Sequence, residues 1–374
     1  MIFLWLLTGI AIINLVTALM AFKKRKVAPL KEHPDITIIC RTWDDDHVVG
    51  RFIDGCLNQD YRGKIQIILA DDASQDATSE VVKKYKGKIE YIRAVKHHKW
   101  KALFLNKIIK TRVKGEILIN TDIDAVLPRN YVTEMVRSLQ NCDAVSSTCI
   151  GGNPDTIISK VRIIEDLWFF ATSMVGRAVI TRRSAIYGGS HAIWMKVLKA
   201  INYYGTKTMT EDAELAVILH QKGYKTCFSD RTVVLLEDVV SLSHFLNERK
   251  RWLYGLFSVS KYYRVFQPYN LLAGFNSILS GVALISAALI TVTPLFVIPF
   301  GLSLVTLLLS LFREKAKPYV YSWIPIYILL DPILECMALL GIIIDSTLGK
   351  GVKWIKVSGS KYHVGSHLIS VFKR

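Results

Sequence analysis

The sequence predicts an α/β domain with a mostly parallel sheet, flanked by transmembrane helices. Short apolar runs alternate with amphipathic stretches between residues 35 and 149, a pattern typical of parallel sheets covered by helices. Residues 1–22 carry no charged side chain, and neither do residues 265–312. Apolar spans of about 20 residues are long enough to cross a bilayer.

The first apolar stretch predicts a membrane anchor that is not cleaved. Residues 1–22 are followed directly by the basic run 23–26 (KKRK), and basic residues mark the cytoplasmic flank of a membrane helix. A cleaved signal peptide carries its charge before the apolar run and has a small-residue cleavage site after it. We therefore expect an integral protein of the plasma membrane whose next domain lies in the cytosol.

The alternating region predicts five strands. They are expected at 35–40, 65–71, 89–95, 116–122 and 143–149, with helices at 47–59 and 77–85 between them. Ligands of such sheets bind beyond the carboxyl ends of the strands. The residues that follow each strand are therefore the first candidates for function.

Carboxylates follow three of these strands. Asp44 comes after the first strand, Asp71 and Asp72 end the second, and Asp122 and Asp124 end the fourth. No GxGxxG follows any strand, which excludes a dinucleotide-binding turn. Because carboxylates repel phosphate, the pattern predicts Mg²⁺ or Mn²⁺ held by Asp122 and Asp124 between the protein and a diphosphate. An isolated pair of this kind also occurs as a turn cap, so the clusters have to be weighed together.

Six short motifs make the chain resemble the membrane-bound branch of glycosyltransferase family 2, which includes cellulose, hyaluronan and poly-N-acetylglucosamine synthases. The motifs are DDASQDAT (71–78), KALFLN (101–106), TDIDA (121–125), GGS (188–190), TED (210–212) and ERKRW (248–252). The resemblance extends from about residue 35 to residue 252, and the order of the motifs makes it specific.

This resemblance implies a GT-A type nucleotide-sugar-binding domain over residues 30–240. It implies Asp212 as the base that accepts the proton of an acceptor hydroxyl, with Glu211 beside it, although TED before the helical pattern 213–223 also suits an ordinary helix cap. The metal ligands it implies are Asp122 and Asp124. The nucleotide contacts it implies are Asp44, Asp71, Asp72, Lys101 and Asp122, and the acceptor contacts are Gly188, Gly189, Ser190, Glu248, Arg251 and Trp252.

The chain departs from the family pattern at three places. Asp44 and Asp45 stand where Asn-Glu is common, and His191 follows GGS where a small residue is usual. Glu248 replaces the glutamine of the family's QxxRW signature. Because of the change at position 248, the resemblance does not establish that the enzyme is processive, that is, that it retains a growing product for repeated addition.

The C-terminal part predicts further membrane contacts. Residues 241–264 form an amphipathic pattern typical of an interfacial helix, and 265–312 fit two membrane spans with a turn near Pro294. The next apolar stretch, 319–344, contains Asp331 and Glu335, so it either crosses the membrane or dips in and returns. The membrane region thus covers 265–345, and a basic tail follows at 346–374.

Composition narrows the remaining classes. The net charge of +17 comes without a nucleic-acid recognition motif, so anionic lipid and a diphosphate substrate are the expected counterparts. Six cysteines show no CxxC spacing and are expected to be reduced and mostly buried. His97 and His98 are adjacent and are expected to point to different sides of a solvated basic turn.

The leading hypothesis is an inverting membrane glycosyltransferase that moves a sugar, from a UDP-sugar in our interpretation, to a growing β-linked polysaccharide. A second hypothesis is a single transfer to a lipid or polyprenyl-linked acceptor. A third is a membrane protein that keeps the fold only as a binding module. The presence of both Asp124 and Asp212 disfavours the third hypothesis, because a relic would be free to lose either.

Overall fold

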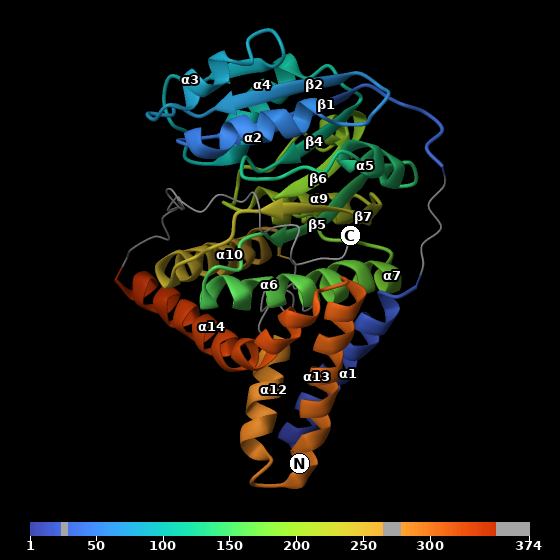
Figure 1. Cartoon of the computed structure of the whole chain (residues 1–374), viewed down its shortest axis with the longest axis vertical. Coiled ribbons are helices and arrows are strands. Elements are labelled where there is room, and N and C mark those ends of the chain that lie inside the picture. The colour runs from blue at the N-terminus through green and yellow to red at the C-terminus, as the bar shows by residue number, and fades with distance from the viewer. Residues whose placement is uncertain (24–28, 265–277, 349–374) are drawn as a thin grey trace. The chain divides into compact units, whose positions relative to one another are not determined.

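The computed structural model describes residues 1–23, 29–264 and 278–348, and the chain forms two compact units. The sheet unit comprises Arg25–Cys149 and Arg182–Leu236. The helical unit comprises Met1–Lys24, Ile150–Thr181 and Glu237–Arg374. The chain thus enters and leaves each unit more than once, as the colours of Figure 1 show.

The described part of the sheet unit is built on one sheet of seven strands in the order β3-β2-β1-β4-β6-β5-β7. The neighbours from β3 to β4 run parallel, whereas β6 runs antiparallel to both β4 and β5. The strands are β1 (Ile36–Thr42), β2 (Ile65–Asp71), β3 (Glu90–Arg93), β4 (Ile117–Thr121), β5 (Ala144–Gly151), β6 (Ser190–Trp194) and β7 (Thr226–Leu236). The predicted α/β class with a mostly parallel sheet is therefore confirmed.

All five expected strands are present, with ends that differ from the expectation by at most two residues. They form because runs rich in isoleucine and valine suit a buried, pleated surface; in β4 every residue is buried. The strands β6 and β7 were not expected. β6 is short and begins inside the GGS segment, where glycines mask the strand pattern.

Helices cover the sheet and begin close to the carboxyl ends of the strands (Figure 1). Their buried residues are mainly apolar, as in α4, where Ala102, Phe104, Leu105, Ile108 and Ile109 are enclosed. The helices of this unit are α2 (Asp46–Leu57), α3 (Thr78–Lys83), α4 (Lys101–Arg112), α5 (Tyr131–Leu139), α8 (Met195–Ala200) and α9 (Glu211–Gln221).

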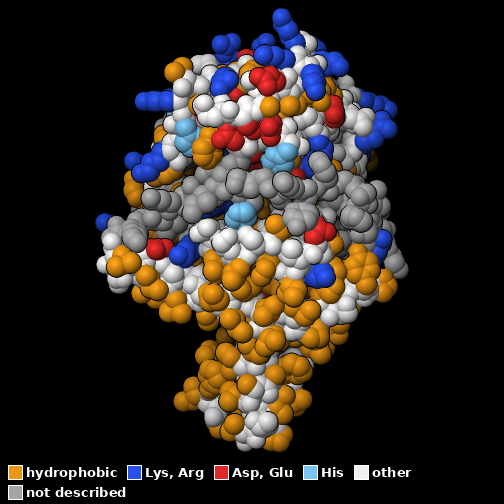
Figure 2. All heavy atoms as spheres, turned by 60° about the vertical axis from the view of Figure 1, so that its left-hand side comes forward, with side chains coloured by type: hydrophobic (Ala, Val, Ile, Leu, Met, Phe, Trp, Pro, Cys, Tyr) orange, Lys and Arg blue, Asp and Glu red, His pale blue; other side chains and the backbone are white. Residues whose placement is uncertain are grey.

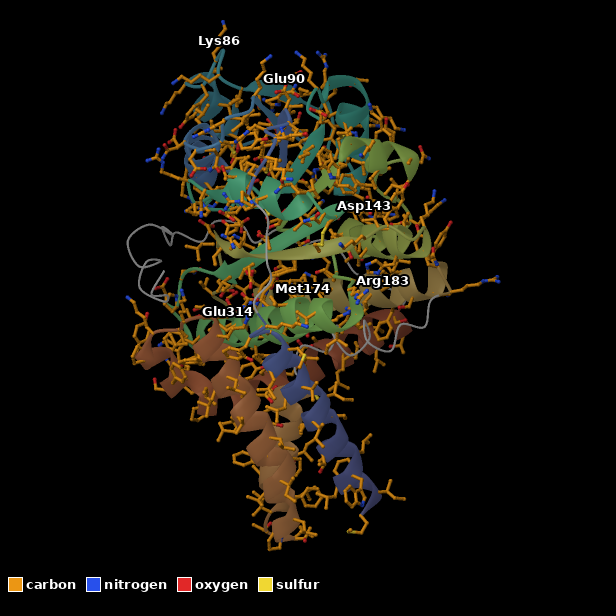
Figure 3. All side chains as sticks on the ribbon, turned by 90° about the vertical axis from the view of Figure 1, so that its right-hand side faces the viewer. Lys86, Glu90, Asp143, Met174, Arg183 and Glu314 are labelled. Carbon is orange, nitrogen blue, oxygen red and sulfur yellow. A yellow bond between two sulfur atoms is a disulfide. The ribbon has the colours of Figure 1, made fainter. Side chains whose placement is uncertain are left out.

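The expectation that the cysteines are all reduced is wrong for one pair. Cys142 and Cys227 form a disulfide next to Asp143, which Figure 3 labels. Their Cα atoms lie 6.0 Å apart, within the range that a disulfide spans. The two residues are 85 positions apart in the chain, so their proximity could not be read from the spacing. Cys40, Cys56 and Cys149 are free and buried, whereas Cys336 is free and exposed.

The described part of the helical unit contains three helical segments that are long and apolar enough to cross a membrane: Ile2–Met20, Pro294–Arg313 and Pro318–Thr347. By their length and composition, these segments indicate that the protein is associated with a membrane. A shorter apolar helix, α12, begins the part described after residue 277, so one of the two spans expected at 265–312 lies partly outside the described residues. Figure 2 shows hydrophobic side chains over most of the surface of these helices.

Besides these apolar segments, the helical unit contains helices that are shorter or more polar. The described elements of the unit are α1 (Ile2–Met20), α6 (Ile157–Phe169), the π-helix η1 (Phe170–Gly176), α7 (Arg177–Thr181), α10 (Leu242–Tyr262), α12 (Ile278–Leu289), η2 (Pro294–Phe296), α13 (Val297–Arg313), η3 (Pro318–Trp323) and α14 (Ile324–Thr347). Figure 3 labels Met174 within η1, against which α1 packs. A side chain at Gly176 would collide with the backbone of Thr17 in α1, so glycine permits this close approach.

Candidate active site

Three parallel strands end at the same edge of the sheet and bring the acidic loops together. Ile36 of β1 lies opposite both Ile65 of β2 and Ile117 of β4. Asp44 then joins two of the loops, because its Oδ1 accepts a hydrogen bond from the backbone N–H of Gln75 at 2.5 Å. Asp44 has a φ of 54°, a conformation that aspartate adopts more readily than most residues. In this structure Asp44 therefore joins the loop after β1 to the loop after β2.

Asp71 and Asp72 are both fully buried. Asp71 accepts a hydrogen bond from the backbone of Ser74 at 2.8 Å, and Asp72 accepts one from Arg41 Nη2 at 2.6 Å. Burial opposes ionisation of Asp72, but hydrogen bonds from His98 and the charge of Arg41 outweigh it and hold its pKa below the ordinary value. Both carboxylates are occupied by contacts inside the protein, and their expected contact with a nucleotide stays a prediction.

His97 and His98 converge on Asp72, so the expectation that they point to different sides is wrong. His98 Nδ1 lies 2.6 Å from Asp72 Oδ1, and His97 Nδ1 lies 3.4 Å from Asp72 Oδ2. The reason is local geometry: the chain bends on both sides of the pair, whereas neighbouring side chains diverge only in extended backbone. The His97 ring also packs 4.1 Å from the ring of Trp43.

Lys101 connects two of the predicted motifs. It opens α4, and its Nζ lies 2.6 Å from Asp122 Oδ1 and 3.7 Å from Glu211 Oε1. Burial opposes the charge of Lys101, but the two carboxylates outweigh burial and raise its pKa above the ordinary value. One ammonium group therefore bridges TDIDA after β4 and TED at the start of α9, although Lys101 and Glu211 are 110 positions apart.

Asp212 is held by two backbone N–H groups. Gly188 donates to its Oδ2 and Ala213 donates to its Oδ1, each at 2.8 Å. A Cβ at position 188 would lie 2.9 Å from Asp212 Oδ2, so glycine allows this approach. Burial first, and then the charge of Glu211, raise the pKa of Asp212 to about 6, against the two hydrogen bonds and Lys101. Such a pKa leaves the carboxylate ionised at neutral pH but basic enough to take a proton.

The rest of the GGS segment supports the site from inside the sheet. The carbonyl of Gly189 accepts a hydrogen bond from Thr121 Oγ1 at 2.9 Å. Ser190 is fully buried, and its hydroxyl lies 2.7 Å from that of Tyr131. Of the expected acceptor contacts in this segment, Ser190 is thus enclosed in the fold, where it stabilises β6 beside β4.

His191 is also buried and stays neutral. Its Nδ1 lies 3.0 Å from the carbonyl of Tyr187, and its Nε2 lies 2.8 Å from the hydroxyl of Tyr204. Burial lowers the pKa of His191 to about 4. The unusual residue after GGS therefore fills the interior of the sheet unit and positions Tyr204.

Glu248, Arg251 and Trp252 lie on α10 and belong to the helical unit, whereas Asp212 belongs to the sheet unit. The Trp252 ring has two guanidinium groups close to it, those of Arg162 and Arg249, each 4.9 Å from the ring centroid. Glu248 Oε2 is buried without a hydrogen-bond partner among the described residues. Its charge also contributes, after burial and Glu165, to raising the pKa of Asp166 to about 7.

Residues 37–199 match Glycosyl transferase family 2. The chain carries a family 2 glycosyltransferase domain. The match includes Asp122 and Asp124 but ends before Glu211 and Asp212. The connection between the two pairs comes from the structure, in which Lys101 contacts both Asp122 and Glu211.

Related proteins extend the family 2 similarity. The chain is 22% identical over 237 residues to the probable glycosyltransferase YdaM of Bacillus subtilis, covering 60% of this chain and 56% of that protein. It is 20% identical over 241 residues to poly-beta-1,6-N-acetyl-D-glucosamine synthase of Staphylococcus aureus, covering 63% of this chain and 58% of the synthase. The similarity therefore spans a little over half the length of these curated relatives.

A solved structure shares the fold. The mannosyltransferase PcManGT from Pyrobaculum calidifontis, in complex with GDP-Man and Mn²⁺, superposes with a TM-score of 0.62 at 18% identity. The superposition covers 91% of this chain and 99% of that chain. At this identity the similarity establishes the fold of the family 2 domain together with its helices.

The family 2 fold implies a divalent cation, and the donor set after β4 fits one. The described residues contain no group of three or more His, Cys, Asp or Glu side chains that could hold an ion. Mg²⁺ needs fewer protein ligands, because it is usually held by one or two carboxylates plus substrate phosphates. Asp122, whose side chain is 44% exposed, and Asp124 two residues later are the two carboxylates expected to hold such an ion.

Sequence reasoning missed several side chains that shape this site. Arg41, Trp43 and Tyr131 were not singled out, yet each contacts a predicted residue or its partner. Arg41 could have been found, because it is a cation at the carboxyl end of β1, next to the acidic residues of the loop that follows. Tyr131 gave no such signal, since its contact with Ser190 depends on the antiparallel placement of β6.

Proposed function

We propose that this chain is an inverting glycosyltransferase that moves a sugar from a nucleotide-sugar donor to a hydroxyl of a growing β-linked polysaccharide. One observation carries the proposal. Lys101 holds Asp122 and Glu211 together, so the residues expected to bind the donor diphosphate and those expected to activate the acceptor form one constellation.

The nucleotide would bind through side chains that Asp72 positions. Arg41 and His97 both contact the Asp72 carboxylate, and the side chain of His97 is 35% exposed. The neighbouring ring of Trp43 offers an aromatic face for the base. Stacking of this kind tolerates different bases, so Trp43 does not select the base. We assign a UDP-sugar as the donor, and the panel of donors described in the Discussion tests this assignment.

The diphosphate would lie beside Lys101 and the two aspartates after β4. A Mg²⁺ or Mn²⁺ ion held by Asp122 and Asp124 would supply Lewis-acid stabilisation to the leaving diphosphate. Lys101 adds a fixed positive charge within hydrogen-bonding distance of Asp122. It would also keep Asp122 and Glu211 from repelling each other before the donor binds.

The proton of the acceptor hydroxyl would pass to Asp212. The hydroxyl oxygen attacks the anomeric carbon, the bond from that carbon to the diphosphate oxygen breaks, and the freed proton moves to a carboxylate oxygen of Asp212. Each of those oxygens accepts one backbone N–H and keeps a second lone pair for the proton. Attack from the side opposite the diphosphate inverts the configuration of the sugar.

The acceptor would be a glycan whose recognition involves α10. We place the catalytic domain at the cytosolic face of the plasma membrane, because basic residues follow α1 directly. A single transfer to a lipid-linked acceptor is the second candidate. Two observations favour it: Glu248 has a buried oxygen without a partner, and both arginines near Trp252 compete with a sugar for the ring.

The proposal is tested with Asp212→Asn in the purified full-length chain. Transfer to acceptor should fall by a factor of about 10² or more, because the amide cannot accept the proton, whereas nucleotide binding should persist. Asp155→Asn, which changes an exposed aspartate outside the site, is the matched control and should transfer normally. Loss of nucleotide binding with normal transfer at saturation would assign Asp212 to the donor instead.

A further inference from the structure

The last described helix of the helical unit, α14, is apolar enough to cross a membrane, but polar side chains connect its start, middle and end to α6, α10 and α12. The segment Pro318–Thr347 has a mean hydropathy of 2.1 over its most apolar window. In Figure 1, α14 runs across the direction of α12 and α13. Its contacts to the other helices of the unit show why.

The beginning of α14 lies beside α6. Lys160 of α6 sits 5.6 Å from the ring centroid of Trp323, the residue directly before the helix. Trp323 also packs 5.5 Å from Tyr319. Tryptophan and tyrosine next to lysine are typical of the boundary between lipid and water.

The middle of α14 faces α10 and the first turn of α12. Glu335 Oε1 lies 3.0 Å from Arg249 Nε, and Asp331 Oδ2 accepts a hydrogen bond from Ser280 at 2.8 Å. Both carboxylates are buried within the helical unit. The polar side of α14 is therefore turned inward, toward the other helices.

The end of α14 returns to α10. Lys250 Nζ lies 2.8 Å from Asp345 Oδ2, two residues before the helix ends. The Lys250 side chain crosses α14 at Gly341, where a Cβ would collide with it. The side chains that anchor the middle and the end of α14 are thus neighbours in sequence, Arg249 and Lys250.

These contacts are not compatible with a helix that crosses the bilayer. From Trp323 to Asp345 an α-helix extends about 33 Å, slightly more than the hydrocarbon thickness of about 30 Å. A crossing α14 would place Lys160 and Lys250 on opposite sides of the membrane. Yet α6 and α10 are joined directly by the ion pair of Glu165 with Arg249, and neither charged helix is suited to cross.

The outward side of α14 is a continuous apolar stripe. We define the α14 stripe as the exposed residues Leu329, Ile333, Met337, Leu340, Ile343 and Ile344, which are 41–59% exposed. They recur at helical spacing opposite the buried carboxylates, as in helices that lie in a membrane interface.

We propose that α14 lies along the membrane surface, with the α14 stripe inserted among the acyl chains of the leaflet that faces α6 and α10. The occupant of the stripe is lipid, because the segment Pro318–Thr347 is apolar enough to enter a membrane. Only residues 314–317 separate it from α13, which is itself a candidate membrane span. Leu348 then emerges on the same side as α10. The basic tail 346–374 lies almost wholly outside the described residues, and this assignment would agree with the positive-inside tendency.

Single-cysteine labelling in sealed membrane vesicles tests the side on which α14 ends. In a Cys336→Ser background, which removes the exposed native thiol, the full chain carries Leu348→Cys, Lys86→Cys or Val292→Cys. Lys86 lies in the sheet unit, which follows α1, and Val292 lies in the turn between α12 and α13. An impermeant maleimide should label positions 348 and 86 in the same vesicle orientation and position 292 in the other. Labelling of 348 together with 292 would overturn the proposal.

Depth measurements test the contact with lipid independently of topology and of transferase activity. Nitroxides on Ile333→Cys and Leu340→Cys should both lie at a similar, shallow depth in phosphatidylglycerol-containing vesicles. A crossing helix would separate them by about 10 Å along the membrane normal. A difference in depth of about 10 Å between the two probes would refute an α14 that lies parallel to the membrane, and so would two probes that are both accessible to water. This test does not depend on whether the Leu348→Cys variant folds.

Discussion

The pH dependence of transfer should report Asp212 directly. The pKa of Asp212 is raised from its ordinary value to about 6, so the folded enzyme needs a pH above about 6 to keep the base ionised. At pH 7 about nine-tenths of the molecules would carry the ionised carboxylate, and at pH 5 about one-tenth would. We therefore expect kcat/KM for the acceptor to be on a plateau near pH 7 and to fall about tenfold per pH unit well below 6.

The assay is transfer of a labelled sugar at limiting acceptor from pH 4.5 to 8, with the wild type and Asp212→Asn measured in parallel. The variant should be slower by about 10² or more at pH 7 and should lose the limb near pH 6. A wild-type profile that is flat down to pH 4.5, or a variant that keeps the same limb, would refute Asp212 as the base. Donor affinity measured over the same range separates this limb from effects on nucleotide binding.

Three further predictions follow from the same geometry. Lys101→Met should move the acid limb to higher pH, because Lys101 opposes the raised pKa of Asp212; an unmoved limb would contradict the contact. Activity should vanish with a chelator and return with Mn²⁺ or Mg²⁺, and Asp124→Asn should behave like the chelated enzyme; full turnover without a divalent ion would remove the metal from the proposal. Glu248→Gln should lengthen the product, since an ionised glutamate only accepts hydrogen bonds whereas glutamine also donates them; unchanged product sizes by gel filtration would return that position to the family pattern.

The sheet was predictable because its signal is local. Runs such as 65–71 and 116–122 are apolar and bounded by polar turns, and they became β2 and β4. The strands β6 and β7 were missed because their placement depends on pairing with distant partners: Ser190 lies opposite Thr121 of β4. Sequence periodicity carries the pattern of a strand but not the identity of its neighbour.

The candidate site was predictable as a set of residues but not as a set of contacts. The motifs led to Lys101, Asp122 and Glu211, and these side chains lie together. The burial of Asp72 and the convergence of both histidines on it could not be read from the sequence. They depend on how the chain folds back after β3, and a charge pattern alone does not distinguish a carboxylate that binds a ligand from one that orients an arginine.

Sugar transfer from a nucleotide donor, with Asp212 as the base beside Lys101, Asp122 and Glu211, can be measured directly. Purified full-length protein in lipid is incubated with Mn²⁺ and a panel of UDP- and GDP-sugars, with acceptor glycan or polyprenyl phosphate, and release of nucleoside diphosphate is measured together with the size and linkage of the product. We predict that one donor is consumed with formation of an equal amount of β-linked product by the wild type and that Asp212→Asn releases almost none. No transfer from any donor by a protein that binds nucleotide, or equal transfer by wild type and variant, would contradict the proposed role of these residues.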